Sequence, residues 1–401
     1  MPADGVPVRP LAVVLHSRQP LTTDPADTFD PAAWDVVVLT DAEAGDVLRE
    51  DVDAETPQVL RASREAWAGT IRGLAAGRPV QIVANDEYCV AACARLREQF
   101  GLPQRHPSRP EHYLDKVVTK ERLAAAGVRV PRFEALRDGV PGPEHGVPWI
   151  VGRVGLPVVA KPRTEANSRG VRVLREEADL RAWLADHEGD HGWQVEEYLD
   201  GTFHHVNALV RDGEVTPVQA GTYLGPLLDL PSGRRLGGWT VPHDDELARR
   251  AHALDAAVVA ALGGEGAFVV HTEFARTTDD ELVVIEVAAR APGALVSELA
   301  RLHAAVHLER ANLALQAGLP VPEAGPTGTQ AAWVWIPVMP GERYRRTPAT
   351  TSGRLVHVRR AATRTHEGAS GSLGVSVLLW HADPSTLAAD VRTAATAAWC
   401  S

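Results

Sequence analysis

The segment AFVVHTEFARTTDDELVVIEVAAR, residues 267–290, carries the pattern that decides the fold. Two apolar runs, 268–274 and 282–288, are separated by the polar turn TTDD at 277–280. Short runs rich in β-branched residues on either side of a polar turn predict two neighbouring β-strands. Because both runs are otherwise apolar, we expect both strands to be buried.

Charged residues interrupt these strands at a few positions, and because side chains alternate along a strand, His271 and Glu273 share one face. Glu286 and Arg290 likewise share one face of the second strand. Unpaired carboxylates are costly to bury, and magnesium takes one or two carboxylates together with substrate phosphates. The pattern therefore predicts a magnesium site on Glu273 and Glu286, where Arg290 would bind a phosphoryl group or an oxyanion. A structural Glu286–Arg290 ion pair is the alternative, but it leaves Glu273 unexplained.

Lysine is very rare in this chain. Of 41 basic residues only three are lysine, namely Lys116, Lys120 and Lys161. A lysine ammonium is a compact charge on a flexible stem, which suits it to a phosphate group. The alternative is that these lysines remain by chance, and for Lys120 the sequence offers no other explanation.

A polar loop follows Lys161, which ends an apolar run. The loop, residues 163–171 with sequence RTEANSRGV, closes on glycine and re-enters a strand. Backbone N–H groups in such a turn bind anions. The loop residues Ser168, Arg169 and Gly170 are therefore candidate phosphate contacts.

A third motif, VEEYLDG at residues 195–201, is a strand that runs into a glycine turn. Its main chain offers donors and acceptors to the edge of an adenine ring, which makes Glu196, Glu197 and Leu199 candidates for the base site. The alternative is a plain strand with an exposed acidic end.

The rest of the chain reads as alternating strands and helices. Near the N-terminus, apolar runs at 11–15, 36–39 and 80–84, followed by a helical pattern at 86–100, predict a small doubly wound parallel sheet. It contains no Gly-x-Gly-x-x-Gly, so we assign it no dinucleotide. Further along, the sequence predicts helices at 114–126, 246–262 and 295–317, a Pro/Gly connection at 141–148, and C-terminal strands at 332–337, 354–359 and 376–380.

Bulk composition excludes several classes of protein. The 401 residues are 45% hydrophobic and 23% charged, as in a globular protein of two to four domains. The net charge of −11 disfavours nucleic acid as a partner. No apolar run approaches a membrane span, and the start lacks the pattern of a secretory signal. We therefore expect a cytoplasmic protein with no membrane or nucleic-acid partner.

Together, the motifs over residues 80–320 resemble the ATP-grasp superfamily in order and spacing. The resemblance implies ATP and magnesium (Mg2+) as cofactors. It also implies that Lys116 and Lys161 are the nucleotide lysines, and that the loop 164–170 is a flap over the β- and γ-phosphates. By the same likeness Glu196 and Leu199 contact adenine, Glu273 and Glu286 hold magnesium, and Arg290 and His271 are the candidate catalytic residues.

Two positions depart from the superfamily pattern. Phe203 stands where many relatives place a ribose-binding glutamate, and the candidate replacements are His204, His205 and Asn207. Ala288 stands where many place an asparagine as a further magnesium ligand, so the number of magnesium ions stays open. Within the superfamily, the motifs around Glu273 and Glu286 look most like those of L-amino-acid ligases.

The resemblance implies an α/β fold in three parts. An N-terminal doubly wound parallel sheet (1–110) precedes an ATP-grasp domain (111–320), whose two α+β subdomains clasp ATP. A small C-terminal α+β segment (321–401) follows.

The function implied is that of a carboxylate–amine ligase. It would activate a small carboxylate as an acyl phosphate and join it to an amine, by analogy in natural-product biosynthesis. A carboxylase that activates bicarbonate and a degenerate ATP-binding sensor are the alternatives. The substrates and the oligomeric state stay open, with a homodimer among the possibilities.

Overall fold

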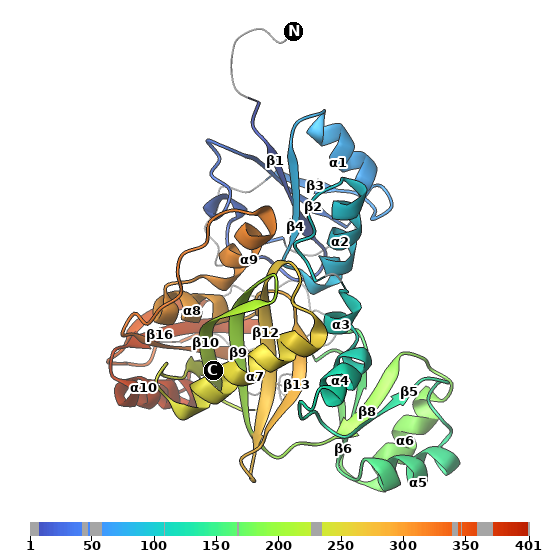
Figure 1. Cartoon of the computed structure of the whole chain (residues 1–401). Helices are drawn as coiled ribbons and strands as arrows, with labels where there is room; N and C mark the ends of the chain where they lie inside the picture. The colour runs from blue at the N-terminus through green and yellow to red at the C-terminus, as the bar shows by residue number, and fades with distance from the viewer. Residues whose placement is uncertain are drawn as a thin grey trace.

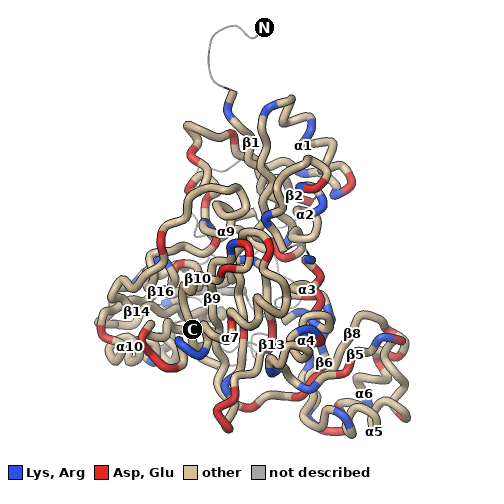
Figure 2. Tube along the Cα trace, viewed as in Figure 1, with Lys and Arg blue, Asp and Glu red and all other residues tan. Residues whose placement is uncertain are grey.

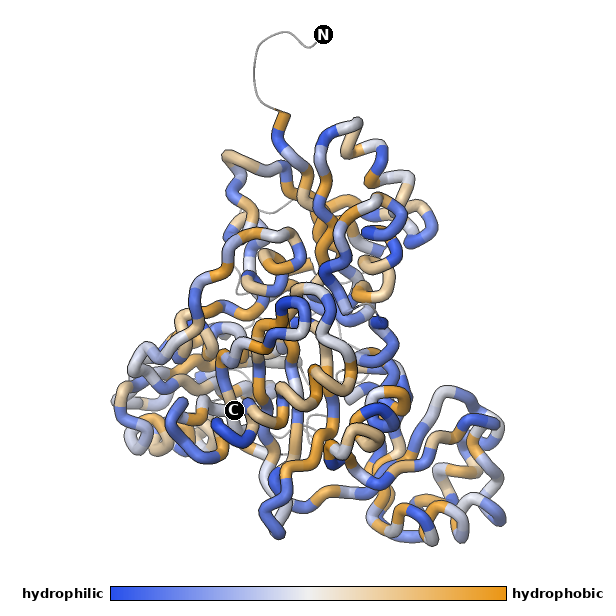
Figure 3. Tube along the Cα trace, viewed as in Figure 1, coloured by the Kyte–Doolittle hydropathy of each residue, from blue (hydrophilic) through white to orange (hydrophobic). Residues whose placement is uncertain are grey.

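The computed structural model describes residues 8–41, 47–48, 58–107, 109–166, 168–225, 235–338, 344–345, 347–358 and 372–399. These residues form three β-sheets with helices packed against them (Figure 1). Apolar segments follow the strands and the inner sides of the helices (Figure 3). Among the helices of the described residues, none combines the length and hydrophobicity that a membrane span requires.

The N-terminal sheet is parallel, with the strand order β3-β2-β1-β4. Its strands are β1 (Leu11–His16), β2 (Asp35–Thr40), β3 (Gln58–Arg61) and β4 (Val80–Ala84). The chain moves outward from β1 to β3 and then places β4 on the other side of β1, which confirms the doubly wound prediction. Helices α1 (Trp67–Ala75) and α2 (Val90–Gln99) cover one face.

The central sheet has eight strands in the order β13-β12-β9-β10-β11-β14-β16-β15. They are β9 (Gly201–Arg211), β10 (Glu214–Tyr223), β11 (Leu236–Thr240), β12 (Ala267–Thr277), β13 (Leu282–Ala288), β14 (Gln330–Val338), β15 (Gly353–Val358) and β16 (Ser372–His381). Helix α7 (Glu246–Leu262) covers one face, where Phe268 packs with Val258. Helices α8 (Val296–Ala304) and α9 (Leu308–Ala317) cover the other, where Val269 packs with Leu299. Neighbouring residues of β12 thus point into different layers.

The third sheet is antiparallel, in the order β5-β8-β6-β7. Its strands are β5 (Phe133–Leu136), β6 (Val158–Pro162), β7 (Arg172–Leu174) and β8 (Trp193–Glu197). One face packs on helices α5 (Pro143–Arg153) and α6 (Glu177–His187), with Val195 in that core. Because side chains alternate, Gln194 and Glu196 point from the opposite face, toward helix α4 (Lys116–Ala125).

Two predicted helices are each divided in the structure. The helix expected at 114–126 is interrupted at Asp115, where α3 (Glu111–Leu114) ends and α4 begins. Asp115 has an extended backbone, and its carboxylate accepts hydrogen bonds from the first turn of α4, so it caps the new helix. The helix expected at 295–317 is divided at Ala305, whose left-handed φ of 61° ends α8.

The prediction of a Pro/Gly connection at 141–148 was wrong, because α5 begins at Pro143. Proline is tolerated at a first helical position, where its missing N–H would have had no partner. Pro148 lies inside the helix but on its exposed side, whereas Val147 and Ile150 are buried against α6. Tertiary packing of these two side chains outweighs the local preference of proline.

The C-terminal strands β14, β15 and β16 extend the central sheet through β11. Helix α10 (Pro384–Thr396) packs against β14 and β16. The segment predicted as a small C-terminal α+β unit therefore shares one continuous sheet with the strands that carry the predicted metal ligands.

A buried amide network joins the N-terminal sheet to the rest of the molecule. The Asn312 side chain, on α9, lies 2.9 Å from Asn85 Oδ1 and accepts from the backbone of β12. Gln316 bonds both the N–H and the carbonyl oxygen of Ala84 at 2.8 Å. This network fixes the carboxyl end of β4 beside the end of β13.

Candidate nucleotide and metal site

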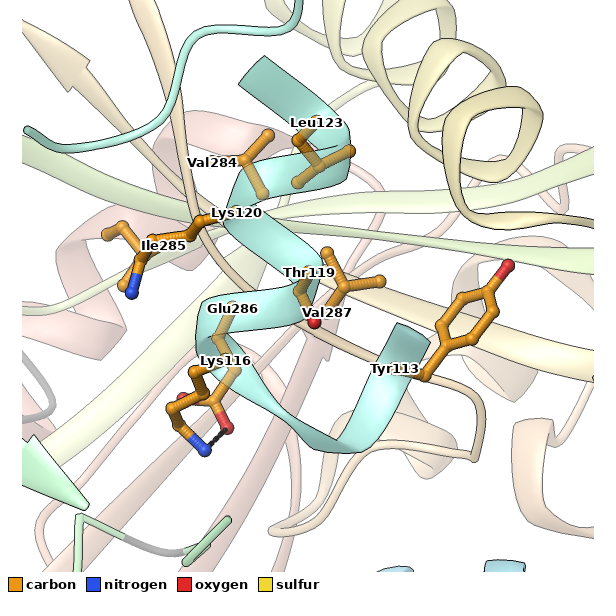
Figure 4. Close-up of a pocket in the computed structure, with 9 residues that line it drawn as sticks. All are labelled: Tyr113, Lys116, Thr119, Lys120, Leu123, Val284, Ile285, Glu286 and Val287. Atoms are coloured by element: carbon orange, nitrogen blue, oxygen red, sulfur yellow. Dashed lines mark ion pairs between the residues drawn. The ribbon is translucent and has the colours of Figure 1, made fainter. Parts of the chain in front are cut away.

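Helix α4 presents two lysines to the space between the central and third sheets. Lys116 and Lys120 are four residues apart, so they project from the same side of the helix, as Figure 4 shows. With Glu286 of β13 they line part of a pocket between α4 and β13. Lys116 Nζ lies 3.2 Å from Glu286 Oε1.

The third sheet supplies the third lysine. Lys161 on β6 is paired in register with Gln194 on β8, and Glu196 lies on the same face as Gln194. Glu196 Oε1 lies 2.6 Å from Lys161 Nζ, and its Oε2 lies 2.5 Å from Lys120 Nζ. Lys120 Nζ also donates to Gln194 Oε1 at 2.9 Å. Every lysine of the chain therefore belongs to one buried cluster, at the basic positions of α4 and β6 in Figure 2.

Burial and charge act against each other in this lysine cluster. Burial raises the pKa of the Glu196 carboxyl, but Lys120 and Lys161 outweigh burial and hold that pKa below its usual value. Burial, reinforced by the charges of the other two lysines, outweighs Glu196 and lowers the pKa of Lys120 to about 7. Three lysines face two carboxylates here, so the cluster is suited to an anionic ligand.

The β12–β13 hairpin places two carboxylates directly opposite each other, at the pair Glu273↔Glu286. A β-bulge follows at once, because the next pair is Phe274 with Val284. Bulges re-aim side chains and are common beside active sites. Like charges opposite each other on neighbouring strands repel, so this pair favours a cation.

The two carboxylates have different partners. Burial raises the pKa of the Glu286 carboxyl, but Lys116 and Lys161 outweigh burial and hold that pKa below its usual value. Glu273 Oε1 accepts a hydrogen bond from Tyr223 at 2.9 Å and lies 3.4 Å from His271 Nε2. His271 and Glu273 therefore share a face, as predicted from strand alternation.

A buried hydrogen-bond chain fixes His271 in place. His271 Nδ1 lies 2.8 Å from Asn207 Oδ1 on β9, and Asn207 Nδ2 lies 3.0 Å from His205 Nδ1. Burial lowers the pKa of His205 well below its usual value, and the nearby ring of His271 adds to the effect. The neutral His205 and the amide of Asn207 hold the His271 ring directed toward Glu273.

The donor set fits magnesium better than a transition metal. Within the described ranges, no group of three or more His, Cys, Asp or Glu is close enough to hold a metal by itself. Glu273 and Glu286 are two hard oxygen ligands whose mutual repulsion a divalent cation would remove. Such a pair matches magnesium, which completes its octahedron with phosphate oxygens and water.

Arg290 pairs with the N-terminal part of the chain. Its Nε and Nη2 lie 3.0 and 2.6 Å from Glu87 Oε2, and its Nη1 donates to the Ala291 carbonyl at 2.9 Å. The alternative of a Glu286–Arg290 ion pair is wrong, because Glu286 pairs with Lys116 and Arg290 with Glu87. Arg290, which follows β13, thus links that strand to Glu87, just after the end of β4.

The predicted phosphate loop is hydrogen-bonded to Lys116 of α4 and to Tyr88 of the N-terminal part of the chain. Lys116 Nζ donates to the Glu165 carbonyl at 2.6 Å, and Tyr88 donates to Glu165 Oε2 at 3.1 Å. The loop turns through Ser168 and Gly170, which have φ values of 54° and 75°. Asn167 lies outside the described residues. Gly170 packs closely on Pro162, the residue after Lys161, and Arg169 Nε lies 3.9 Å from Glu165 Oε2.

Two base-site candidates lie in different environments. Glu197 points away from the lysines and binds Arg129 at 2.9 Å and Arg132 at 2.7 Å. Leu199 is half-buried in the segment before Gly201. At Gly201, with φ of 148°, a Cβ would lie 2.2 Å from the Arg276 carbonyl oxygen, so only glycine fits this hinge. The structure does not bring Glu197 to the lysine cluster.

Sequence reasoning gave no role in this site to Lys120, Glu87 and Tyr88. The rarity of lysine was a usable signal for Lys120. Nothing local marks the other two, because their partners are at least 77 residues away along the chain.

The chain is similar to known proteins in sequence and in fold. No protein-family model matches the chain. It is 33% identical over 247 residues to N5-carboxyaminoimidazole ribonucleotide synthase of Mycobacterium tuberculosis, which covers 59% of this chain and 53% of that protein. The chain spans about half, or less, of the length of the curated relatives it matches.

Two solved structures cover almost the whole chain. An L-amino acid ligase from Bacillus licheniformis has a TM-score of 0.68 and 19% identity, covering 96% of both chains. A biotin carboxylase domain from Hydrogenobacter thermophilus, solved with MgADP and bicarbonate, has a TM-score of 0.64 and 16% identity, covering 96% of this chain and 89% of that one. The chain therefore has the ATP-grasp fold, and its structural neighbours are ATP-grasp carboxylate–amine ligases and carboxylases.

Proposed function

We propose that this chain is an ATP-dependent carboxylate–amine ligase that activates a small carboxylate as an acyl phosphate. One observation carries the proposal. All three lysines and the carboxylates Glu196 and Glu286 meet in one buried cluster, at the junction of α4 with the central and third sheets. A buried cluster with surplus positive charge beside two opposed carboxylates suits a nucleotide triphosphate with its magnesium ion.

ATP would lie between the third sheet and the β12–β13 hairpin. Lys116 and Lys161 would bind its phosphates, and Glu273 and Glu286 would hold magnesium. When bound, magnesium would neutralise charge on the β- and γ-phosphates and align them for transfer. Glu196 and the backbone near Leu199 would contact the base.

The reaction would proceed in two displacements. A carboxylate oxygen attacks the γ-phosphorus, the bond from that phosphorus to the β–γ bridging oxygen breaks, and ADP leaves. An amine then attacks the carbonyl carbon of the acyl phosphate, inorganic phosphate leaves with the bonding electrons, and the amine loses a proton. The guanidinium of Arg290 would orient the carboxylate and offset the oxyanion that forms. His271, held toward Glu273, would position that metal ligand.

The 164–170 loop would exclude water from this intermediate. Lys116 holds the loop through the Glu165 carbonyl, and Tyr88 holds it from the N-terminal part. Closure over the reacting groups protects an acyl phosphate from hydrolysis.

A carboxylase that activates bicarbonate is a second candidate. The match to N5-carboxyaminoimidazole ribonucleotide synthase and the bicarbonate complex among the structural neighbours favour it. The chemistry of activation would be the same, because bicarbonate is also a carboxylate-like nucleophile toward the γ-phosphorus.

A phosphate-release screen separates the candidates. The full chain, ATP and magnesium chloride would be incubated with pairs of amino acids, other small acids and amines, and bicarbonate, and products identified by mass spectrometry. We expect ADP and phosphate to appear with an acid–amine pair, together with an amide product. Dependence on bicarbonate would favour the carboxylase, and no ADP with any pair or with bicarbonate would contradict both.

A further inference from the structure

Lys120 has no role in the proposed chemistry, although it is one of only three lysines. Its side chain is 2% exposed, and its ammonium contacts Glu196 and Gln194. The ammonium also lies 5.4 Å from the centre of the Phe133 ring. A buried lysine held on three sides in this way has no freedom to reach a ligand.

Glu196 is the centre of this arrangement. Its carboxylate is buried, and it binds two ammonium groups through different oxygens, Lys161 through Oε1 and Lys120 through Oε2. An opposite charge close to a buried carboxylate favours its charged form. Glu196 has two such charges, so one lysine can stay with Glu196 while the other changes partner.

We propose that Lys120 is a positioning residue, the counter-ion that stays with Glu196 and frees Lys161 to bind a phosphate of the nucleotide. The proposal rests on the proposed function, because it presupposes ATP at this cluster. Without Lys120, Lys161 leaving for a phosphate would strand Glu196 as an unpaired buried charge, which is one of the costliest changes in a protein interior. With Lys120 in place, Lys161 changes partner at little cost.

Lys116 and Glu286 provide a contrast on the other side of the cluster. If Lys116 left Glu286 for a phosphate, Glu286 would still have a counter-ion, because Glu273 and Glu286 would hold magnesium between them. Glu196 is on the third sheet and would not share that ion. An additional lysine is therefore needed beside Glu196 and not beside Glu286.

A double-mutant cycle tests the proposal. Binding of AMP-PNP with magnesium would be measured by calorimetry for the parent, Lys120→Met, Glu196→Gln and the double variant. Lys120→Met should weaken binding about tenfold or more in the parent, because Glu196 then retains Lys161. In the Glu196→Gln background the same substitution should weaken AMP-PNP binding by less than about threefold, since no carboxylate is left to hold Lys161. An equal loss of AMP-PNP affinity on Lys120→Met in both backgrounds would overturn the proposal.

Arg97→Met is the matched control. Arg97 is also a buried cation, but it donates to the backbone carbonyls of Ile82 and Pro103, away from the cluster. We expect this variant to be less stable than the parent and to bind AMP-PNP with unchanged affinity. A comparable loss of affinity here would show that any lost buried cation weakens binding, and would overturn the specific role of Lys120.

Nuclear magnetic resonance gives a test that needs no variant of Lys120 to fold. Because the chain has three lysines, side-chain 15N labelling of lysine yields three Nζ signals, and Lys116→Met and Lys161→Met assign them. On adding AMP-PNP and magnesium, the signals of Lys116 and Lys161 should move and that of Lys120 should move least. A Lys120 signal that moves most would overturn the proposal.

The parent separates this proposal from the proposed function. If the parent does not bind AMP-PNP, the nucleotide site fails and the role of Lys120 fails with it. If the parent binds while Lys120→Met binds equally well, only the role of Lys120 fails.

Discussion

Two regions of this molecule bury carboxylates wholly or in large part, and the carboxylates in the two regions have opposite charge states. At the junction of α4 with the central and third sheets, Glu196 and Glu286 face lysines, and their pKa values lie below the usual range. Between α7 and β12, Asp255 faces only the Thr272 hydroxyl at 2.6 Å. Burial raises the pKa of Asp255 to about 7 against the small opposing effect of that hydrogen bond.

The difference indicates which buried carboxylates are ionised and therefore suited to a charged ligand. An acid buried in a packed layer between helix and sheet can remain protonated, which avoids the cost of a buried charge. The carboxylates at the junction remain ionised only because several buried lysines accompany them. Such an arrangement adds nothing to packing, and it is expected where a charged ligand will bind. The following predictions test this division between junction and interior.

Glu286→Gln should have the largest effect on activity. Loss of one metal carboxylate removes several kcal/mol of transition-state stabilisation, so kcat/KM for ATP-dependent phosphate release should fall on the order of a thousandfold. Steady-state kinetics measure it. Glu281→Gln, at an exposed carboxylate just before the same strand, is the matched control and should leave the rate unchanged. Full activity in Glu286→Gln would remove the metal site from the account.

Asp255→Asn should change stability and leave activity unchanged. The folded pKa of about 7 exceeds the unfolded value, so the unfolded chain loses the proton first and stability falls as pH rises from about 4 to 7. Between pH 5 and pH 8 the parent should lose about 2 to 3 kcal/mol relative to the asparagine variant. Denaturant unfolding of both proteins at the two pH values measures this, and parallel pH profiles would contradict a neutral buried acid.

Glu87→Gln should have an intermediate effect, on both stability and activity. The substitution removes the charged partner of Arg290, so the free energy of unfolding should fall by about 2 kcal/mol. The KM for the carboxylate substrate should change too, because Arg290 loses its fixed orientation. Glu98→Gln, at an exposed position of α2, is the control. If the free energy of unfolding and the KM of Glu87→Gln both match those of Glu98→Gln, the Glu87–Arg290 contact has no role in the site.

Tyr88→Phe should have the smallest effect. It removes two hydrogen bonds between the N-terminal part and the 164–170 loop, one that Tyr88 donates to Glu165 Oε2 at 3.1 Å and one that it accepts from the Ala166 N–H at 3.4 Å, together worth on the order of 1 kcal/mol. The KM for ATP should rise about fivefold with little change in the free energy of unfolding. Tyr344→Phe, which removes a hydroxyl in the C-terminal segment, should leave the KM unchanged. Equal KM values for the two variants would mean that the loop closes without Tyr88.

Much of the fold was predictable from periodicity. The strands around Glu273 and Glu286, the parallel strands β1, β2 and β4, and helix α7 all have simple apolar patterns, and the structure confirms them. The helix breaks at Asp115 and Ala305 were not predicted, because a cap or a left-handed residue gives no signal in an apolar pattern. Helix α5 was missed because its packing outweighs its prolines.

The candidate site was predictable only in part. Rare residue types in apolar strands marked Lys161, Glu273 and Glu286, and strand alternation placed the last two together. The counter-ion Lys120 and the partner of Arg290 depend on how separate sheets dock, which local patterns do not encode. Glu197 was selected for its motif, but its alternate position on β8 directs it to Arg129 and Arg132 instead.

Transfer of oxygen from substrate to phosphate tests the central claim most directly. The full chain would be incubated with ATP, magnesium and the acid–amine pair found in the screen, with 18O in the carboxylate of the acid. Mass spectrometry of the inorganic phosphate would then show whether a carboxylate oxygen attacked the γ-phosphorus. The account predicts one 18O in the released phosphate, with ADP as the nucleotide product. Unlabelled phosphate, or AMP in place of ADP, would contradict it.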